Sequence, residues 1–337
     1  MIYPLTLTSF GKGRDFESFP SFQWKWKKKG EEPILRMSRI LVIGAKGMLG
    51  RALVSELHHS LSEYDVLAWD IEEIDIRKRE ETIAKIEEVH PSVVVNLAAY
   101  TDVDGCETNV QEAFLVNSDG MRHIAEGVRR CKGKAVYLST DYVFDGQKKT
   151  PYVEEDLPNP LNIYGHSKWR GEQAALELEE NGLVVRTQWL YGPNGKNFVA
   201  AILRQAREKL RPSNSDRVLS IVDDQFGSPT FTVDLSQAIA LMIRRRASGI
   251  YHVTNSHCCS WYEFGQAILS FCGIEAIKVN PIPSCQLDRK AIRPSYSVLS
   301  NEKLKRETGI QLRPWPEALK DFLLHLQRQG ELDWVKE

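Results

Sequence analysis

Two side chains near the middle of the chain have the types and the spacing needed to exchange a proton with a substrate oxygen. Tyr164 and Lys168 are four residues apart in the segment YGHSK, so a helix would place the phenol and the ammonium on one face. Of the eleven tyrosines in the chain, only Tyr164 is followed by a lysine four residues later. Because so short a pattern also arises by chance, its place in the fold must decide whether it carries chemistry.

The chemistry sets a requirement on the tyrosine. A phenol has a pKa near 10, and proton exchange near neutral pH requires a pKa lower by about three units, or about 4 kcal/mol. An ammonium about 4 Å away supplies about that much at an effective dielectric near 20. We therefore expect Lys168 to lower the pKa of Tyr164, and Thr140, 24 residues before Tyr164, to hydrogen-bond the same substrate oxygen. The plain alternative is a helix start with a solvated lysine and a half-buried tyrosine.

A glycine-rich turn near the start of the patterned sequence could hold a phosphorylated cofactor. The segment RILVIGAKGMLGR combines an apolar run with three glycines and the start of a helical pattern; its key residues are Gly44, Gly47, Met48, Leu49 and Gly50. Backbone N–H groups at a helix start lack internal partners and carry the positive end of the helix dipole, and glycines let a pyrophosphate approach them. The first glycine gap is one residue wider than usual, so this string alone is weak support.

An acidic residue about 20 residues further on completes the expected pattern, because it binds the adenosine ribose of a dinucleotide. Asp70 ends the short apolar segment DVLAWD, 20 residues after Gly50. The sequence therefore predicts a strand, a tight turn, a helix and a second strand that together bind a dinucleotide. The bland alternative is glycine punctuation without a ligand.

Composition bounds the class of protein. The 337 residues are 42% hydrophobic and 26% charged, which suits one large domain or two unequal ones. A net charge of −1 gives no argument for nucleic acid or for an anionic membrane, and no apolar run is long enough to span a membrane. Six cysteines without a C-x-x-C pair and eight histidines without H-E-x-x-H favour a cytoplasmic protein with reduced thiols and no metal ligands.

Alternating strands and helices predict an α/β fold with a Rossmann-like, doubly wound parallel sheet and a smaller, interleaved carboxyl-terminal lobe. We expect an extension, disordered or a translation-start artefact, at 1–36, a NAD(P)-binding domain at 37–190 and a substrate lobe at 191–330. A strand near 249–254 should return to the sheet. Further strands are expected at 92–97, 134–138 and 183–187, and helices at 109–131, with a capping box, and at 162–180.

Taken together, these motifs resemble the extended short-chain dehydrogenase/reductase superfamily and, within it, the dTDP-4-dehydrorhamnose reductase family. The resemblance begins near residue 37 and covers almost all of the remaining chain. It rests on the ordered motifs GAKGMLG, VVNLAAYTDVDGCE, STDYVFDG, YGHSK, RTQWLYG, DQFGSPT and RPSYSVL. So many motifs in order are specific for the family and less specific for the exact sugar.

The resemblance implies reduction of the C4 keto group of a nucleotide-linked 6-deoxyhexulose by NADPH or NADH. Tyr164 would protonate the C4 oxygen, Lys168 would also hold the nicotinamide ribose, and Thr140 would orient the carbonyl. Cofactor contacts are implied for the glycine turn and for Asp70, Asp75, Ile76, Ala99, Tyr100 and Thr101; sugar contacts are implied for Thr140, Asp141 and Trp189. Trp189 could instead be a core aromatic, and Asn117, which could support the lysine through water, could instead only pack its helix.

Related activities can be weighed on single residues. A nucleotide-sugar 4,6-dehydratase resembles this chain at Ser139 to Asp141 but has a glutamate next, where Tyr142 stands here, so we expect no dehydration. An epimerase of the same superfamily is harder to exclude, because it needs only the hydride step and rotation of the intermediate. The non-catalytic regulatory subunit of methionine adenosyltransferase also resembles the family, but the intact Thr140, Tyr164 and Lys168 set favours an enzyme.

The cofactor signals are mixed. Asp70 favours the free ribose 2′-hydroxyl of NADH, whereas Lys46 resembles a basic residue found in NADPH-using relatives and Arg51 is a further phosphate partner. We therefore expect both cofactors to be used. Some family members also use a divalent cation, for which no ligands can be named here. The choice of dTDP or UDP and the existence of a homodimer cannot be read from the sequence.

Overall fold

The computed structural model of the protein describes residues 38–335, and the predicted extension at 1–36 lies outside this range. Within the described residues, six parallel strands form one sheet in the order β10-β5-β4-β3-β1-β2. These strands are β1 (Ser38–Ile43), β2 (Tyr64–Trp69), β3 (Val93–Asn96), β4 (Lys134–Thr140), β5 (Gly182–Thr187) and β10 (Gly249–His252). The predicted doubly wound α/β sheet is confirmed, and its strand order reverses beside β1, which is where such sheets bind ligands.

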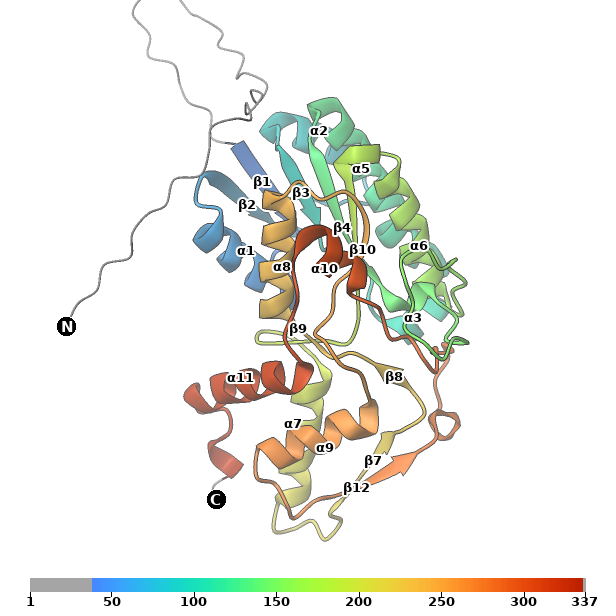
Figure 1. Cartoon of the computed structure of the whole chain (residues 1–337), viewed down its shortest axis with the longest axis vertical. Helices are drawn as coiled ribbons and strands as arrows, with labels where there is room; N and C mark the ends of the chain where they lie inside the picture. Colours follow the sequence, from blue (N-terminus) through green and yellow to red (C-terminus); the bar gives the residue numbers. More distant parts are fainter. Residues whose placement is uncertain (1–37, 336–337) are drawn as a thin grey trace, which may run out of the picture. The chain divides into compact units, whose positions relative to one another are not determined.

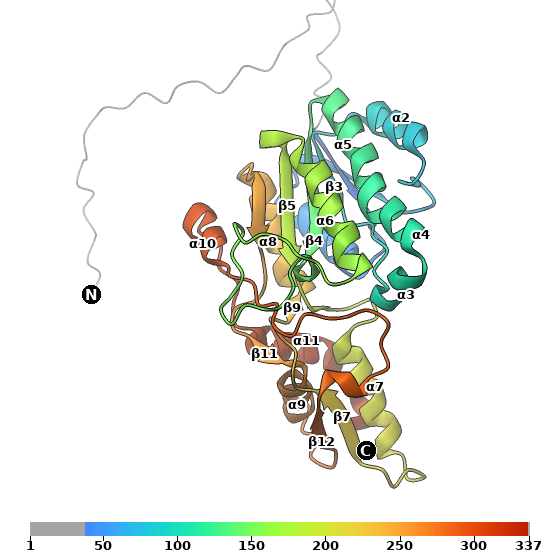
Figure 2. The same cartoon turned by 90° about the vertical axis from the view of Figure 1, so that its right-hand side faces the viewer.

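Helices cover both faces of the sheet, as Figures 1 and 2 show. One face carries α1 (Met48–Ser60) and α8 (Thr232–Arg244), and the other carries α2 (Arg79–Val89), α5 (Gly120–Cys131) and α6 (Ile163–Leu176).

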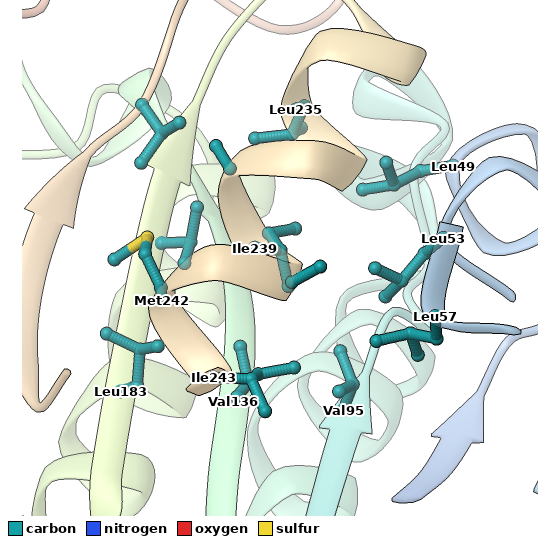
Figure 3. Packing of buried hydrophobic residues seen from close by; sticks show 14 of the residues in the cluster. Leu49, Leu53, Leu57, Val95, Val136, Leu183, Leu235, Ile239, Met242 and Ile243 are labelled. Atoms are coloured by element: carbon teal, nitrogen blue, oxygen red, sulfur yellow. The ribbon is translucent and has the colours of Figure 1, made fainter. Parts of the chain in front are cut away.

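Strand β1 shows why the central strands read as continuous apolar runs. Its side chains alternate between the two faces, so that Ile40 and Val42 pack towards α1 and α8, while Leu41 and Ile43 pack towards α2 and α5. In Figure 3, leucines of α1 and apolar side chains of α8 meet over the strands. Burial on both faces leaves only the ends of these strands free to contact a ligand.

The helix expected over 109–131 is wrong as one element. The chain forms α3 (Val103–Thr108), α4 (Val110–Phe114), a π-helical turn (Leu115–Asp119) and then α5. The expected capping box is also absent at this start, because the Asn109 side chain donates to the Tyr100 hydroxyl and to the carbonyl oxygen of Gly105 and caps nothing. The π turn, a feature common at functional sites, brings Asn117 against the backbone of Tyr100.

Two other boundaries differ from the sequence pattern. Helix α6 ends at Leu176, not at residue 180, because the chain turns sharply under its last turn: a Cβ on Gly182 would lie 2.2 Å from the carbonyl oxygen of Ala175. Strand β4 runs two residues further than expected, to Thr140, so that Thr140 ends the strand directly at the sheet edge.

A second group of elements lies beyond the carboxyl ends of the strands (Figure 1). It contains α7 (Phe198–Leu210), α9 (Trp261–Phe271), α11 (Trp315–Arg328) and the parallel pair β7 (Val218–Val222) and β12 (Lys278–Ile282). Its core is aromatic and includes Tyr191, Phe231, Phe264 and Phe322. The segment between β7 and β12 also supplies α8 and β10 to the sheet, so the two groups are interleaved along the chain.

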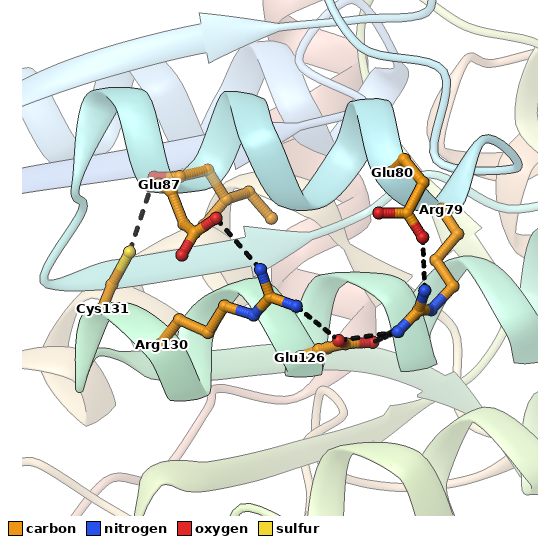
Figure 4. Close-up of polar contacts among 7 residues, drawn as sticks. Arg79, Glu80, Glu87, Glu126, Arg130 and Cys131 are labelled. Atoms are coloured by element: carbon orange, nitrogen blue, oxygen red, sulfur yellow. Dashed lines mark hydrogen bonds and ion pairs between the residues drawn. The ribbon is translucent and has the colours of Figure 1, made fainter.

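Charged side chains tie α2 to α5 on their exposed side (Figure 4). Glu126 accepts from Arg79 at 2.7 Å and from Arg130 at 2.9 Å, and Arg130 also reaches Glu87 at 3.2 Å. Because water screens such pairs, each contributes about 0–1 kcal/mol to stability. Among residues 38–335, no helix is both long enough and apolar enough to cross a membrane.

Candidate active site

A cleft of about 1180 Å³ lies at the carboxyl ends of β1, β3, β4 and β5. Every site residue named from the sequence lines it except Tyr100. Tyr100 contributes backbone: its N–H donates to the Asn117 side chain at 2.8 Å, and its hydroxyl accepts from Asn109 at 3.1 Å. Asn117 spends its amide on the backbone of Tyr100 and on Ser167, which it meets at 2.9 Å, so it supports the cleft wall directly.

The glycine turn has the shape that a pyrophosphate needs. Gly44 has a φ of +83°, which favours glycine, and a Cβ there would lie 2.7 Å from the backbone nitrogen of Ala98. A Cβ on Gly50 would lie 2.2 Å from the carbonyl oxygen of Gly44, so only glycine lets α1 start this close to β1. Within the described chain, no side chain caps the helix start at Gly47 and its first turn has no acidic residue. Uncapped N–H groups at this edge of the cleft therefore fit a bound anion.

Asp70 lies beside this turn at the end of β2. Its carboxylate accepts from the backbone N–H groups of Lys46 and Ile71, each at 2.9 Å, so Asp70 also fixes the turn itself. The Lys46 ammonium pairs with Glu72 at 2.8 Å, and both side chains are more than half exposed. Arg51 does not line the cleft; its guanidinium donates to the carbonyl oxygen of Lys46.

Asp75 and Ile76 lie on the same side of the cleft. The Asp75 carboxylate is held by Arg77 through two nitrogen atoms, at 2.8 and 2.9 Å, and this hydrogen bonding lowers the pKa of Asp75. Arg77 also donates to Glu112 at 2.8 Å. Asp75 is therefore an oriented carboxylate whose charge is balanced by its neighbour.

Tyr164 and Thr140 meet at the inner part of the cleft. Tyr164 lies in the first turn of α6, whose start is capped by the Asn162 side chain, which accepts from the N–H of Gly165 at 2.8 Å. Burial raises the pKa of Tyr164 and so does the nearby Asp141, while a hydrogen bond with Thr140 lowers it. The net direction is opposite to the lowering that the sequence predicted from Lys168, because the low-dielectric site disfavours a phenolate.

Lys168 lies one turn further along α6 and is only 3% exposed. Its ammonium nitrogen lies 4.1 Å from the centre of the Tyr137 ring. Burial lowers the pKa of Lys168 to about 7, against the effect of Glu172, which raises it. Glu172 is itself held by Arg186 at 2.7 Å and by the Ser139 hydroxyl at 2.5 Å. A buried ion pair therefore lies beneath the catalytic helix.

Asp141 is a buried carboxyl next to the reacting groups. It is 2% exposed, and burial raises its pKa to about 7. Ser297 donates to it at 2.5 Å and Thr140 donates to it at 3.0 Å. These hydrogen bonds lower the pKa without offsetting burial, so Asp141 changes charge close to neutral pH. Ser297 belongs to the predicted motif RPSYSVL, which this contact ties to the end of β4.

Sequence reasoning did not assign a role to the charged pair behind Tyr142. Arg293 grips Asp104 with two bonds of 2.6 and 2.7 Å and also hydrogen-bonds the Tyr142 hydroxyl. The Tyr142 ring packs edge-on against Tyr164, with ring centres 5.8 Å apart. Burial raises the pKa of Tyr142 to about 12, so it stays neutral. A tyrosine therefore fills the position where the compared dehydratase pattern has a glutamate.

Trp189 lies in the cleft wall and is not an ordinary core aromatic. It stacks on Trp261 with ring centres 3.5 Å apart and an angle of 12°. The preceding Gln188 is 2% exposed, and within residues 38–335 neither amide atom of Gln188 has a hydrogen-bond partner. Unpaired buried amides are rare, so Gln188 fits a site that receives a polar ligand. Sequence reasoning missed Gln188 and Trp261, because neither spacing nor motif marks them.

The described residues contain no group of three or more His, Cys, Asp or Glu side chains that could hold a metal ion. All six cysteines lie in this range and are free thiols. The cleft thus has a glycine-lined anion end, a proton-donor end with Thr140, Tyr164 and Lys168, and an aromatic wall.

Comparison with known proteins agrees with this geometry. A family model described as RmlD substrate binding domain matches residues 37–328. A dTDP-4-dehydrorhamnose reductase from Aggregatibacter actinomycetemcomitans is 37% identical over 297 residues, which cover 85% of this chain and 98% of that protein. A dTDP-4-keto-6-deoxy-D-glucose reductase from Streptomyces niveus is 40% identical, over 83% of this chain and 95% of that one.

A solved structure has the same fold. The dTDP-4-dehydrorhamnose reductase of Bacillus anthracis, determined in complex with NADP, is 36% identical to this chain. The match has a TM-score of 0.80 and covers 86% of this chain and 99% of that one. Similarity of this extent reaches both the sheet and the second group of elements.

Proposed function

The chain belongs to the family of the RmlD substrate binding domain, and from that premise we propose that it reduces the C4 keto group of a dTDP-linked 6-deoxy-4-ketohexose with NADPH or NADH. It is an NAD(P)-dependent oxidoreductase of the dTDP-4-dehydrorhamnose reductase type. The substrate is dTDP-4-dehydro-L-rhamnose, and the product is dTDP-L-rhamnose. The observation that carries the proposal is the presence of Thr140, Tyr164 and Lys168 in one cleft with the glycine turn and Trp189.

Each of these side chains has one task in the reaction. Reduced nicotinamide, when bound, supplies the hydride for C4. Tyr164 gives its hydroxyl proton to the C4 oxygen while Thr140 holds that oxygen by a hydrogen bond. An alkoxide is about as basic as hydroxide, whose conjugate acid has a pKa of about 15.7, so a phenol with a raised pKa still protonates it. The raised pKa also keeps Tyr164 protonated at neutral pH, as a proton donor must be. Lys168, in its charged form, stabilises the phenolate that remains.

The cofactor lies along the edge of the sheet in this proposal. The N–H groups of Met48, Leu49 and Gly50, next to Gly44 and Gly47, hold its pyrophosphate. The adenosine side meets Asp70, Asp75 and Ile76, and the middle lies along Ala99, Tyr100 and Thr101. Lys168 contacts the nicotinamide ribose. Support comes from the cleft, which these residues line with the exception of Tyr100.

Both NADPH and NADH are accepted. The relative from Bacillus anthracis was solved with NADP, which favours NADPH. Lys46 is the residue that would meet a 2′-phosphate, and its exposed pair with Glu72 can open at little cost. Asp70 favours the 2′-hydroxyl of NADH, and its two backbone hydrogen bonds leave room for further acceptance.

The sugar binds between the end of β4 and the aromatic wall. Thr140 and Asp141 contact the sugar from β4, and Trp189 contacts it from the segment after β5. Tyr142, held by Arg293, stands where elimination would need a carboxylate, so water is not eliminated. The six free thiols fit a reaction in the cytoplasm. A homodimer stays a prediction, and sedimentation of the purified protein tests it.

The experiment that tests this function follows both cofactor and product. Purified protein is mixed with NADPH carrying deuterium at its transferable position and with a panel of dTDP- and UDP-linked 4-ketosugars. Reduction consumes one NADPH per sugar and leaves one deuterium at C4 of the product, with dTDP-4-dehydro-L-rhamnose the fastest substrate. Conversion of a sugar without net NADPH consumption would instead show an epimerase. Absence of any conversion, with binding to another protein, would favour a regulatory subunit.

A further inference from the structure

The backbone of Trp189 is strained. Its φ is +49°, a left-handed conformation that bulky residues rarely adopt. Such strain persists only where the surroundings hold it, and it clusters at ligand sites. Trp189 directly follows the buried, unpaired Gln188 and lines the cleft. Something must therefore hold the Trp189 indole in this position.

The contact that holds it comes from the second group of elements. Trp261 stacks on Trp189 at 3.5 Å between ring centres and 12° between planes, and it lines the same cleft. Offset stacks of this kind add stabilisation beyond burial alone. The stack joins the segment after β5 to the first residue of α9.

Trp261 is itself fixed on three sides. It begins α9 behind a capping box, in which the N–H of Ser260 donates to Glu263 at 2.7 Å and the N–H of Glu263 donates to the Ser260 hydroxyl at 3.1 Å. Phe198 of α7 packs against it with ring centres 4.6 Å apart. The helix start therefore gives Trp261 a defined place and leaves it little freedom to move.

A glycine on the neighbouring strand completes the site around Trp189. Gly227, in β8 (Phe226–Gly227), pairs with Cys259 in β11 (Cys259–Ser260), which leads directly into Trp261. A Cβ on Gly227 would lie 2.5 Å from both the Gln188 side-chain oxygen and the Trp189 ring. The same local unit, β8, β11 and the start of α9, thus supplies both the stacking partner and the close backbone.

We propose that Trp261 is a positioning residue for the nucleotide-sugar substrate: by stacking on Trp189 it holds that strained indole where the sugar binds. This inference rests on the proposed function, in which Trp189 contacts the sugar. Trp261 then acts on substrate affinity through Trp189 and takes no part in proton transfer. It follows that loss of the stack changes KM for the sugar far more than kcat or the affinity for NADPH.

The test compares Trp261→Leu, Trp261→Phe and Trp334→Leu with the wild type. Trp334 is a matched control, because its indole belongs to the same aromatic core but lines a different cavity. We expect Trp261→Leu to raise KM for the ketosugar about tenfold, with kcat within about threefold and Kd for NADPH unchanged. Trp261→Phe should restore most of the affinity, and Trp334→Leu should leave KM unchanged.

Circular dichroism gives an independent readout of the stack. Two stacked indoles produce an exciton couplet, which Trp261→Leu should remove and Trp334→Leu should keep. A normal KM in Trp261→Leu, or a couplet that survives the substitution, would overturn the inference. If the wild type reduces no ketosugar at all, the proposed function fails first and the inference fails with it, and that result is distinct from a wild-type enzyme whose KM ignores Trp261.

Discussion

The ammonium nitrogen of Lys168 lies 4.1 Å from the centre of the Tyr137 ring, and Tyr137 is anchored by its hydroxyl, which donates to the carbonyl oxygen of Asn117 at 2.8 Å. The π-helical turn that contains Asn117 therefore places the aromatic face on which Lys168 rests. Such a face stabilises a cation, but Lys168 is buried, and burial lowers its pKa to about 7. Its charge is thus finely balanced under physiological conditions.

This balance predicts an alkaline limit to the reaction. A lysine is charged below its pKa and neutral above it, so kcat/KM should fall as the pH rises through about 7. Lys168→Met should lower kcat/KM about a hundredfold or more and remove this limb, since no group is left to titrate there. The measurement is kcat/KM for the ketosugar from pH 5.5 to 9.5. A wild-type profile that stays flat up to pH 9.5 would contradict this role of Lys168.

Asp141 predicts a pH dependence of stability. Its carboxyl is protonated in the folded protein up to a pKa of about 7, whereas its usual value is 3.8, so the folded state binds more protons between these values. Stability contributed by the protonated form is therefore full below about pH 4 and is lost as the pH rises towards 7, by up to about 4 kcal/mol.

Asp141→Asn removes this dependence. The free energy of unfolding in urea, measured at intervals from pH 4 to pH 7.5, should fall less steeply with pH in the variant than in the wild type. Ser297→Ala is a useful control, because it removes a hydrogen bond to Asp141 and should raise the pKa of that carboxyl further. Parallel curves for the wild type and Asp141→Asn would show that Asp141 titrates normally.

The glycine turn predicts two opposite results for one kind of substitution. Ala is usually preferred over Gly inside a helix, but a Cβ on Gly50 would lie 2.2 Å from the carbonyl oxygen of Gly44. Gly50→Ala should therefore lower the free energy of unfolding by about 3 kcal/mol and weaken NADPH binding. Gly47→Ala, whose Cβ would meet the same oxygen at 3.3 Å, should cost less than about 1 kcal/mol. Denaturant unfolding of both variants checks this, and equal losses would be evidence against the turn described.

The adenosine end of the cleft predicts a change in cofactor preference. Asp70→Ala should lower kcat/KM for NADH about tenfold more than for NADPH, because the ribose 2′-hydroxyl loses its acceptor. Glu72→Gln is the matched variant, since it frees Lys46 from its ion pair and should favour NADPH without affecting NADH. Steady-state kinetics with both cofactors give the ratio. An unchanged ratio in Asp70→Ala would mean that Asp70 does not reach the ribose.

Local pattern was enough to predict much of this molecule. The apolar run of β1, the glycines after it and Asp70 at the end of β2 are close in sequence, and their spacing defines a strand, a turn and a helix. The alternation of strands and helices then gives the parallel sheet, which brings the carboxyl ends of β1, β3 and β4 to one edge. Tyr164 and Lys168 lie in one helix, so their shared cleft also follows from spacing.

What local pattern could not predict depends on contacts between distant segments. The helix at 109–131 is broken because Asn109 and Asn117 bind the backbone and side chain of Tyr100, a contact that helix propensity does not report. The pKa of Tyr164 is raised because of burial, which arises only when the second group of elements closes over β4. Trp261 reaches the cleft through the capping box and the pairing of β11 with β8, about 70 residues after Trp189 along the chain.

The most direct test of the account concerns the proton that Tyr164 donates. In Tyr164→Phe, kcat/KM for reduction of dTDP-4-dehydro-L-rhamnose should fall about a thousandfold, while Kd for NADPH, measured by fluorescence titration, stays within about twofold of the wild type. Such a result places the lost hydroxyl in the chemical step. A Tyr164→Phe enzyme that retains more than about a tenth of wild-type kcat/KM would contradict the assignment of Tyr164 as the proton donor.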